Sequence, residues 1–165
     1  MKRVFLGIGS NLGNRENSMQ QAVEHINKRV GEVCTTSALY ETEPWGFQSD
    51  DAFLNMVIAV ETQMSPQALL AEILFIESVL GRIRNKAHYS SRIIDIDILL
   101  YGDVVLSEPD LTIPHPLLHE RKFVLIPLCE IASEVVHPVL NKTFRELLDA
   151  CEDSSNVKHF RLPHP

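Results

Sequence analysis

The chain has few of the features that mark extracellular or membrane proteins. It has only 3 cysteines, Cys34, Cys129 and Cys151, an odd number that matches neither a zinc site nor a disulfide framework. No apolar run approaches the roughly 20 residues that cross a bilayer, and the apolar run at residues 4–8 is too short for a signal peptide. These absences predict a cytoplasmic protein with reduced thiols and no membrane partner.

Positive charge is also scarce. The 15 Lys and Arg residues are outnumbered by 22 Asp and Glu, which gives a net charge of −7. Broad binding to nucleic acid or to anionic membranes needs a basic face, so we expect neither partner. A small anionic ligand held by a local basic cluster is still compatible with this balance. The length of 165 residues is typical of one domain, which we expect over residues 1–152, followed by a flexible polar tail over residues 153–165.

Hydrophobic periodicity predicts an α+β fold. Strands are expected at residues 4–8, 33–42, 53–62 and 92–101, and helices at residues 15–30 and 66–80. This βαββαβ order is ferredoxin-like, with an antiparallel sheet and helices on one face. The other face is then free for a ligand. A short return strand at residues 104–106 and a last helix, which a capping box opens at Thr143 and which runs to about Cys151, complete the prediction.

The most informative stretch is the strand at residues 92–101. Ile94, Ile96 and Ile98 share one face, while Asp95 and Asp97 share the other. A strand this apolar is expected in the centre of the sheet. Two carboxylates about 6 Å apart repel by roughly 3 kcal/mol at an effective dielectric of 20, and a bound divalent cation such as Mg²⁺ removes that cost. The alternative is a solvated face on which acids sit freely.

Basic residues gather in the segment before this strand. Arg82, Arg84 and Arg92 bracket it, with Lys86 and His88 inside. Guanidinium groups bind phosphate oxygens in a bidentate manner, so this segment fits a phosphate-binding loop. A solvated basic loop that balances nearby acids is the alternative. The acid pair and the basic loop together favour a magnesium–nucleotide site.

Further candidates lie elsewhere in the chain. His115 stands between two prolines that restrict its backbone, and Arg121 follows as a second possible phosphate contact. Phe53 and Asn55 are expected on the open face of the sheet, where they could stack on and pair with a flat heterocycle. Phe123 opens an apolar run. For all of these residues a purely structural role, in the core or in a solvated loop, is the alternative.

Three glycines near the N-terminus, Gly7, Gly9 and Gly13, are similar to a dinucleotide-binding fingerprint. The third glycine is one residue late, however, and the acidic residue expected about 20 positions further on is missing. We therefore interpret these glycines as sites of tight packing and a turn near a strand end.

Together these residues resemble the 6-hydroxymethyl-7,8-dihydropterin pyrophosphokinase family of folate biosynthesis, up to about Cys151. The resemblance rests on eight motifs in order: Gly7-Ile-Gly9-Ser-Asn-Leu-Gly13, Ser37-x-x-Tyr40-x-Thr42-x-Pro44-x-Gly46, Phe53-x-Asn55, Glu77, Arg82-x-Arg84, Arg92-x-x-Asp95-x-Asp97-Ile98, Ile113-Pro114-His115-Pro116 and Glu120-Arg121-x-Phe123.

The resemblance implies a ferredoxin-like enzyme that moves the β,γ-pyrophosphoryl group of ATP to the pterin hydroxymethyl oxygen and releases AMP. It implies that Asp95 and Asp97 hold two Mg²⁺ ions and that Arg82 and Arg92 are catalytic phosphate contacts. The implied ATP contacts are Glu77, Arg84, Ile98, Thr112, His115 and Arg121. The implied pterin contacts are Thr42, Pro44, Trp45, Phe53, Asn55 and Phe123.

The chain departs from the family pattern at four positions. Ser91 replaces a common proline, Tyr89 a frequent tryptophan, and Asp110 and Leu117 replace basic residues. These changes bear on loop closure and ATP affinity rather than on the type of reaction.

Other functions fit the same fold. A nucleotidyltransferase or cyclase would attack the α-phosphorus and release pyrophosphate, and a sensing module would bind a small molecule without consuming ATP. An RNA-recognition module is disfavoured because a basic-aromatic strand motif is lacking. The expected partners are therefore the two small-molecule substrates, bound by a monomer, with a dimer as the alternative.

Overall fold

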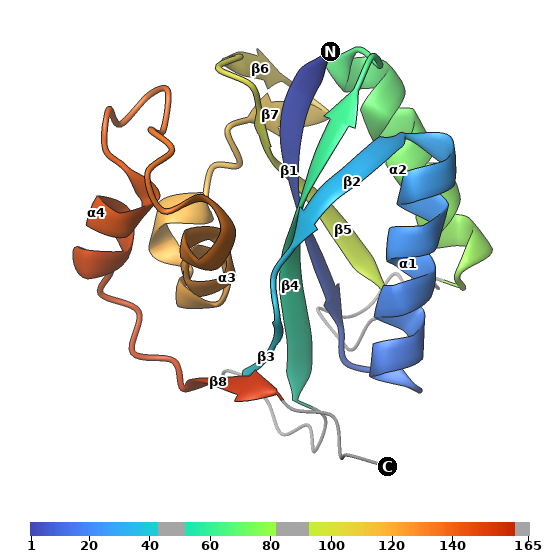
Figure 1. Cartoon of the computed structure of the whole chain (residues 1–165), viewed down its shortest axis with the longest axis horizontal. Coiled ribbons are helices and arrows are strands. Elements are labelled where there is room, and N and C mark those ends of the chain that lie inside the picture. The colour runs from blue at the N-terminus through green and yellow to red at the C-terminus, as the bar shows by residue number, and fades with distance from the viewer. Residues whose placement is uncertain (43–51, 82–92, 161–165) are drawn as a thin grey trace.

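The computed structural model describes residues 1–42, 52–81 and 93–160, and its centre is an antiparallel sheet (Figure 1). The sheet order is β5-β1-β4-β3-β8, and β2 also pairs with β4. The strands are β1 (Lys2–Ser10), β2 (Gly31–Thr36), β3 (Leu39–Thr42), β4 (Phe53–Thr62), β5 (Asp95–Tyr101) and β8 (Val157–Phe160). With α1 (Arg15–Arg29) after β1 and α2 (Pro66–Val79) after β4, the ferredoxin-like βαββαβ prediction is confirmed.

Helices α1 and α2 cover one face of the sheet (Figure 1). Each begins at a side-chain cap: Asn14 accepts a hydrogen bond from the backbone N–H of Asn17, and Ser65 accepts one from that of Ala68. Their apolar sides pack on the alternate residues of β1, β4 and β5 that the periodicity predicts. This core includes Leu6, Ile8, Met19, Ile26, Leu54, Ile58, Leu69, Ile73, Ile76 and Ile96.

The opposite face is only half open. The helices α3 (Lys122–Ala132) and α4 (Phe144–Asp149) lie over it (Figure 1). They form a second core with strand residues that point away from α1 and α2; its members include Phe5, Val57, Ala59, Leu99, Leu125, Leu128 and Phe144. The prediction of a wholly free face is therefore wrong for this half. The capping box at Thr143 is confirmed, although α4 ends at Asp149.

Two predicted segments differ in the structure. The strand expected over residues 33–42 is two strands, β2 and β3, because Ser37 interrupts the ladder: its hydroxyl accepts a hydrogen bond from the N–H of Val57. The tail expected to be flexible instead contains β8, which pairs with β3 and satisfies its outer edge. Asp153 also anchors this segment, because its carboxylate accepts the N–H of Lys122 at 3.0 Å.

Strand β5 lies at an end of the sheet order, so the central position expected for it is wrong. One outward-facing group of β5 is nevertheless paired, because the N–H of Ile96 donates to the carboxylate of Glu77 at 2.9 Å. The expected return strand also differs: β6 (Leu106–Glu108) pairs with β7 (Leu111–Ile113) in a separate hairpin. A short 3₁₀ helix, η1 (Leu118–Glu120), precedes α3.

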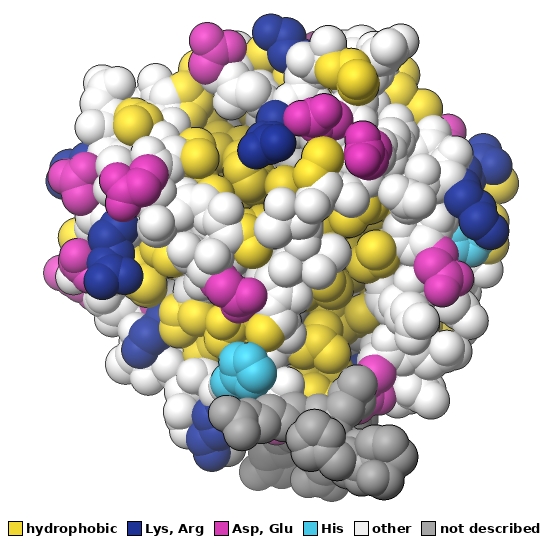
Figure 2. All heavy atoms as spheres, in the orientation of Figure 1, with side chains coloured by type: hydrophobic (Ala, Val, Ile, Leu, Met, Phe, Trp, Pro, Cys, Tyr) yellow, Lys and Arg dark blue, Asp and Glu magenta, His cyan; other side chains and the backbone are white. Residues whose placement is uncertain are grey.

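The face in Figure 2 mixes charges of both signs with apolar side chains, without a large basic patch. Within residues 1–42, 52–81 and 93–160, no helix is long and apolar enough to span a membrane.

Candidate functional site

The open half of the sheet carries a row of candidate residues. Gly9 of β1 lies directly opposite Asp95 of β5 on one side and Asn55 of β4 on the other. Residues directly opposite in antiparallel strands project to the same face. Tyr40 of β3 continues the row beyond Asn55. Two residues before Gly9 in β1, Gly7 lies opposite Asp97. The structure therefore brings the acid pair and Asn55 onto one face, as predicted.

The glycines form a floor between the acid pair and Asn55. A Cβ atom at Gly9 would lie 2.7 Å from Oδ1 of Asn55, closer than real side chains approach. A Cβ atom at Gly7 would make only ordinary contacts, at 3.5 Å from the side chain of Leu99. Gly9 thus leaves room for the Asn55 amide to lie over β1, which agrees with the interpretation of Gly9 as a site of tight packing.

Two further candidates, Phe53 and Thr42, lie beside Asn55 on the sheet, and a third, Phe123, lies in α3. Phe53 lies directly opposite Thr42 in the β3–β4 pair, on the same open face. The Thr42 hydroxyl is buried and has no hydrogen-bond partner among the described residues, which fits a position that could bind a polar group of a ligand. Phe123 begins α3 and is only partly buried, whereas Val124 and Leu125 after it are buried in the second core. A ring that is only partly buried at this helix end can stack on a flat ligand.

His115 and Arg121 supply the basic side of the site. Arg121 lies near His115 and stacks over Phe123, with its guanidinium carbon 5.6 Å from the ring centroid. Burial, with a smaller contribution from Arg121, lowers the pKa of His115, while Asp95 acts in the opposite direction. Nδ1 of His115 accepts the N–H of Leu117 at 3.1 Å, which leaves Nε2–H as the donor of a neutral ring.

Glu77, Ile98 and Thr112 are in a different position, around β5 rather than on the open face. Glu77 is 2% exposed and binds the backbone of Ile96, between the two aspartates. The Ile98 side chain is 6% exposed and belongs to the first core, so only its backbone could contact a nucleotide. Thr112 is exposed on β7. The structure therefore does not group these three with the acid pair.

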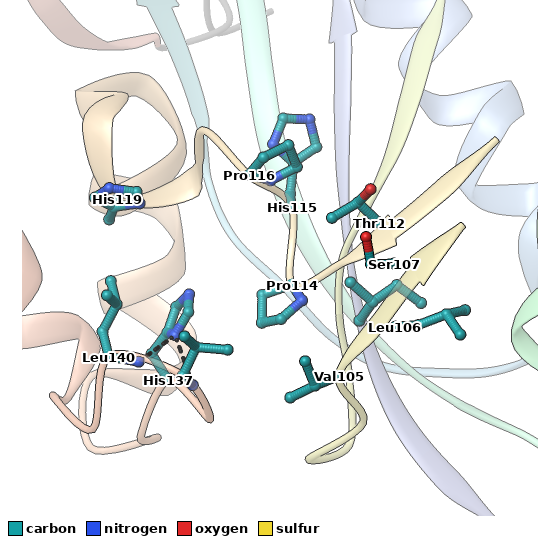
Figure 3. Close-up of a pocket in the computed structure, with 12 residues that line it drawn as sticks. Val105, Leu106, Ser107, Thr112, Pro114, His115, Pro116, His119, His137 and Leu140 are labelled. Atoms are coloured by element: carbon teal, nitrogen blue, oxygen red, sulfur yellow. Dashed lines mark hydrogen bonds between the residues drawn. The ribbon is translucent and has the colours of Figure 1, made fainter. Parts of the chain in front are cut away.

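Thr112 and His115 also line a pocket of about 220 Å³ between the β6–β7 hairpin and the segment at residues 137–140 (Figure 3). Its lining is mainly apolar and contains no Asp, Glu, Lys or Arg. His137 organises one wall, because its Nδ1 accepts the N–H groups of Val139 and Leu140. Burial and the nearby His119 lower the pKa of His137. The pocket borders the candidate site but lacks the charges that phosphate needs.

Several predicted residues fall outside the described residues: Pro44, Trp45, Arg82, Arg84, Lys86, His88, Tyr89, Ser91 and Arg92. Tyr40, by contrast, gains a partner that local sequence could not indicate. Its hydroxyl donates to Glu130 of α3 at 2.5 Å, and burial, with a smaller contribution from that carboxylate, raises its pKa to about 12. The contact fastens β3 to α3 beside the open face.

Comparisons with known proteins point to one family of enzymes. The family model for 7,8-dihydro-6-hydroxymethylpterin-pyrophosphokinase matches residues 5–133. A pyrophosphokinase of Methylorubrum extorquens, 2-amino-4-hydroxy-6-hydroxymethyldihydropteridine pyrophosphokinase, is 43% identical over 137 residues, which are 82% of this chain and 86% of that protein. The enzyme of the same name from Bacillus subtilis is 38% identical over 132 residues, 79% of this chain and 78% of that one.

A solved structure supports the fold. The Plasmodium falciparum HPPK-DHPS wild type with pteroate has a TM-score of 0.73 at 18% identity. The match covers 90% of this chain but only 44% of that longer chain. At that identity the likeness concerns the fold alone, whereas the family match and the two bacterial relatives cover most of this chain. The chain therefore belongs to the 7,8-dihydro-6-hydroxymethylpterin-pyrophosphokinase family.

Proposed function

We propose that the open half of the sheet is the active site for the reaction of this family. The chain is an ATP-dependent pyrophosphokinase of folate biosynthesis that transfers pyrophosphate to 6-hydroxymethyl-7,8-dihydropterin. The observation that carries the assignment is the row Asp95–Gly9–Asn55. Asp95 and Asn55 are two strand spacings apart, roughly 9–10 Å. A pterin held at Asn55 can therefore direct its hydroxymethyl arm toward phosphates held near the aspartates.

The donor chemistry of the acid pair fits magnesium. Asp95 and Asp97 offer hard carboxylate oxygens on one face of an edge strand, and the neighbouring glycines add no side chain. We assign to these two residues the binding of two Mg²⁺ ions. Bound Mg²⁺ would neutralise charge on the ATP phosphates as the reaction proceeds. Glu77 holds the backbone N–H of Ile96, which fixes the strand between the two ligands.

The protein positions the reactants for a direct displacement. The pterin hydroxymethyl oxygen attacks the β-phosphorus of ATP, the bond from that phosphorus to the α,β-bridging oxygen breaks, and AMP leaves with the bridging oxygen. The hydroxyl proton passes to water. Phe53 and Phe123 stack on the pterin, while Asn55 and Thr42 hold its polar groups. Neutral His115, through Nε2–H, and Arg121 donate to phosphate oxygens, and such positioning and charge neutralisation supply most of the rate.

We also assign to the chain a monomeric state and a cytoplasmic location. Light scattering on a sizing column would test the first assignment, since the mass of a dimer would refute it. Fractionation of cells would test the second.

Product analysis tests the reaction itself. ATP, the reduced pterin and Mg²⁺ should yield AMP and the pterin diphosphate in equal amounts. Free pyrophosphate in place of AMP would indicate attack on the α-phosphorus, the nucleotidyltransferase alternative. Binding of pterin without consumption of ATP would indicate a sensing module.

A further inference from the structure

Arg15, the first residue of α1, makes three contacts that draw distant segments together. Its Nη1 donates to Oε2 of Glu41 at 2.9 Å and to the carbonyl oxygen of Ala52 at 2.7 Å. Its guanidinium carbon also lies 5.5 Å from the ring centroid of Phe160. The side chain is only 21% exposed, so these contacts are partly shielded from water.

These contacts lie directly behind Thr42 and Phe53, which together we call the pterin wall. Glu41 precedes Thr42, and Ala52 precedes Phe53. Thr42 and Phe53 are directly opposite each other on the open face, whereas Glu41 lies opposite Leu54, on the face of α1 and α2. Arg15 therefore binds the side chain of Glu41 and the backbone of Ala52, the residues that precede Thr42 and Phe53.

Phe160 adds the C-terminal strand to this arrangement. It lies opposite Leu39 in the β3–β8 pair, on the same face as Glu41, and packs against the first core. It lies outside residues 5–133, which match the family model. A cation is attracted to an aromatic face, and the attraction is stronger where the pair is partly shielded from water, as it is here. The contact thus links a segment beyond the family match to the pterin wall.

We propose that Arg15, braced by Phe160, is a positioning residue for the pterin pocket. The proposal rests on the proposed function, because it concerns the wall that Thr42 and Phe53 form. Arg15 does not touch the substrate. It sets the separation of the two strand ends that carry the wall, and loss of its contacts lets that separation vary.

The same helix offers a matched control. Arg29, its last residue, forms an ion pair with Glu72 and stacks over Phe75 at 4.4 Å. This set has the same chemistry as Arg15, Glu41 and Phe160 but joins α1 to α2, away from the open face. Replacement of Arg29 should therefore lower the general stability of the protein without any effect on the pterin wall.

The experiment compares steady-state kinetics and melting temperature in the full chain. Arg15→Ala should raise the KM for the pterin about 3- to 10-fold, the effect of roughly 1 kcal/mol, with kcat and the KM for ATP within about 2-fold of wild type. Phe160→Ala should act in the same direction and less strongly. Arg15→Lys, which keeps the charge and one donor, should recover part of the loss. Arg29→Ala and Phe75→Ala should lower the melting temperature comparably and leave the pterin KM unchanged.

A reference variant separates this proposal from the function on which it rests. Asn55→Ala should raise the pterin KM if the open face binds the pterin. If Asn55→Ala does so while Arg15→Ala and Arg15→Lys do not, the Arg15 proposal is wrong and the proposed function stands. An equal rise in Arg15→Ala and Arg29→Ala would also overturn it, since the effect would be one of general stability. A pterin KM unaffected by Asn55→Ala refutes the proposed function itself.

Discussion

Replacing Gly9 with alanine should weaken pterin binding without weakening the fold. The new Cβ atom would lie 2.7 Å from Oδ1 of Asn55, and no other described atom lies within 3.5 Å of it. The clash falls on the end of a flexible side chain, which can turn away at little cost to the backbone. The Asn55 side chain must move by about 0.5–1 Å to restore an ordinary contact, and its amide then leaves the position in which we propose that it binds the pterin.

The size of the effect follows from the hydrogen bond that is lost. A typical hydrogen bond contributes about 0.5–1.5 kcal/mol, which corresponds to a rise of roughly 2- to 12-fold in the dissociation constant for the pterin. Stability should move the other way, because glycine within a strand costs roughly 0.5–1 kcal/mol relative to alanine. The melting temperature of Gly9→Ala should therefore equal or exceed that of the wild type. Weaker binding together with unchanged or greater stability is the signature of this mechanism.

Calorimetric titration with the pterin, in the presence of a non-hydrolysable ATP analogue, measures the effect. Gly7→Ala is the control, because its Cβ atom would make only ordinary contacts with Leu99, so pterin affinity should be unchanged. The double variant Gly9→Ala/Asn55→Ala should bind the pterin no more weakly than Asn55→Ala alone, because both substitutions remove the same contact between Asn55 and the pterin. Wild-type affinity in Gly9→Ala, or equal losses in Gly7→Ala and Gly9→Ala, would refute the reasoning.

Three more predictions follow from the site and its surroundings. Asp97→Asn should lower magnesium-dependent turnover by several orders of magnitude with the melting temperature kept, and near-normal turnover would show that the acid pair is misassigned. Phe123→Ala should weaken pterin binding about 5- to 150-fold, from roughly 1–3 kcal/mol of stacking, and unchanged affinity would make Phe123 a core residue. The lowered pKa of His137 means that the unfolded chain binds its proton more readily. Urea unfolding should therefore show stability falling as pH drops below about 6.5, and His137→Ala should flatten that dependence; an unchanged slope would contradict it.

Local patterns predict the parts of the site that depend on strand periodicity. The alternation of Ile96 with Asp95 and Asp97 places the acids on the face away from α1 and α2, and the structure agrees. Phe53 and Asn55 follow from the same rule. A period of two along a strand is a local property, so it can be read without knowledge of the partners.

Long-range pairing explains what the sequence could not predict. The apolar character of β5 favoured a central strand, but the buried carboxylate of Glu77 satisfies the outer N–H of Ile96 and permits an edge position. The polar segment around His159 resembled a tail, yet it pairs with β3, far away in sequence. The second core likewise depends on residues distant in sequence, such as Leu99 and Phe144. None of these contacts leaves a periodic signal within its own segment.

The position of β4 has a consequence for how the enzyme moves. This strand pairs with β1, β2 and β3, whereas β5 has only β1 as a strand partner within the described chain. Amide hydrogens of β4 should thus be among the slowest to exchange with deuterated solvent. Among the outward-facing amides of β5, that of Ile96 should exchange slowly, because Glu77 binds it, and the others should exchange faster. In the site that we propose, the pterin then lies over the best-paired strand of the sheet, while the two aspartates lie on a strand with fewer strand partners, which can adjust as the phosphate chain changes.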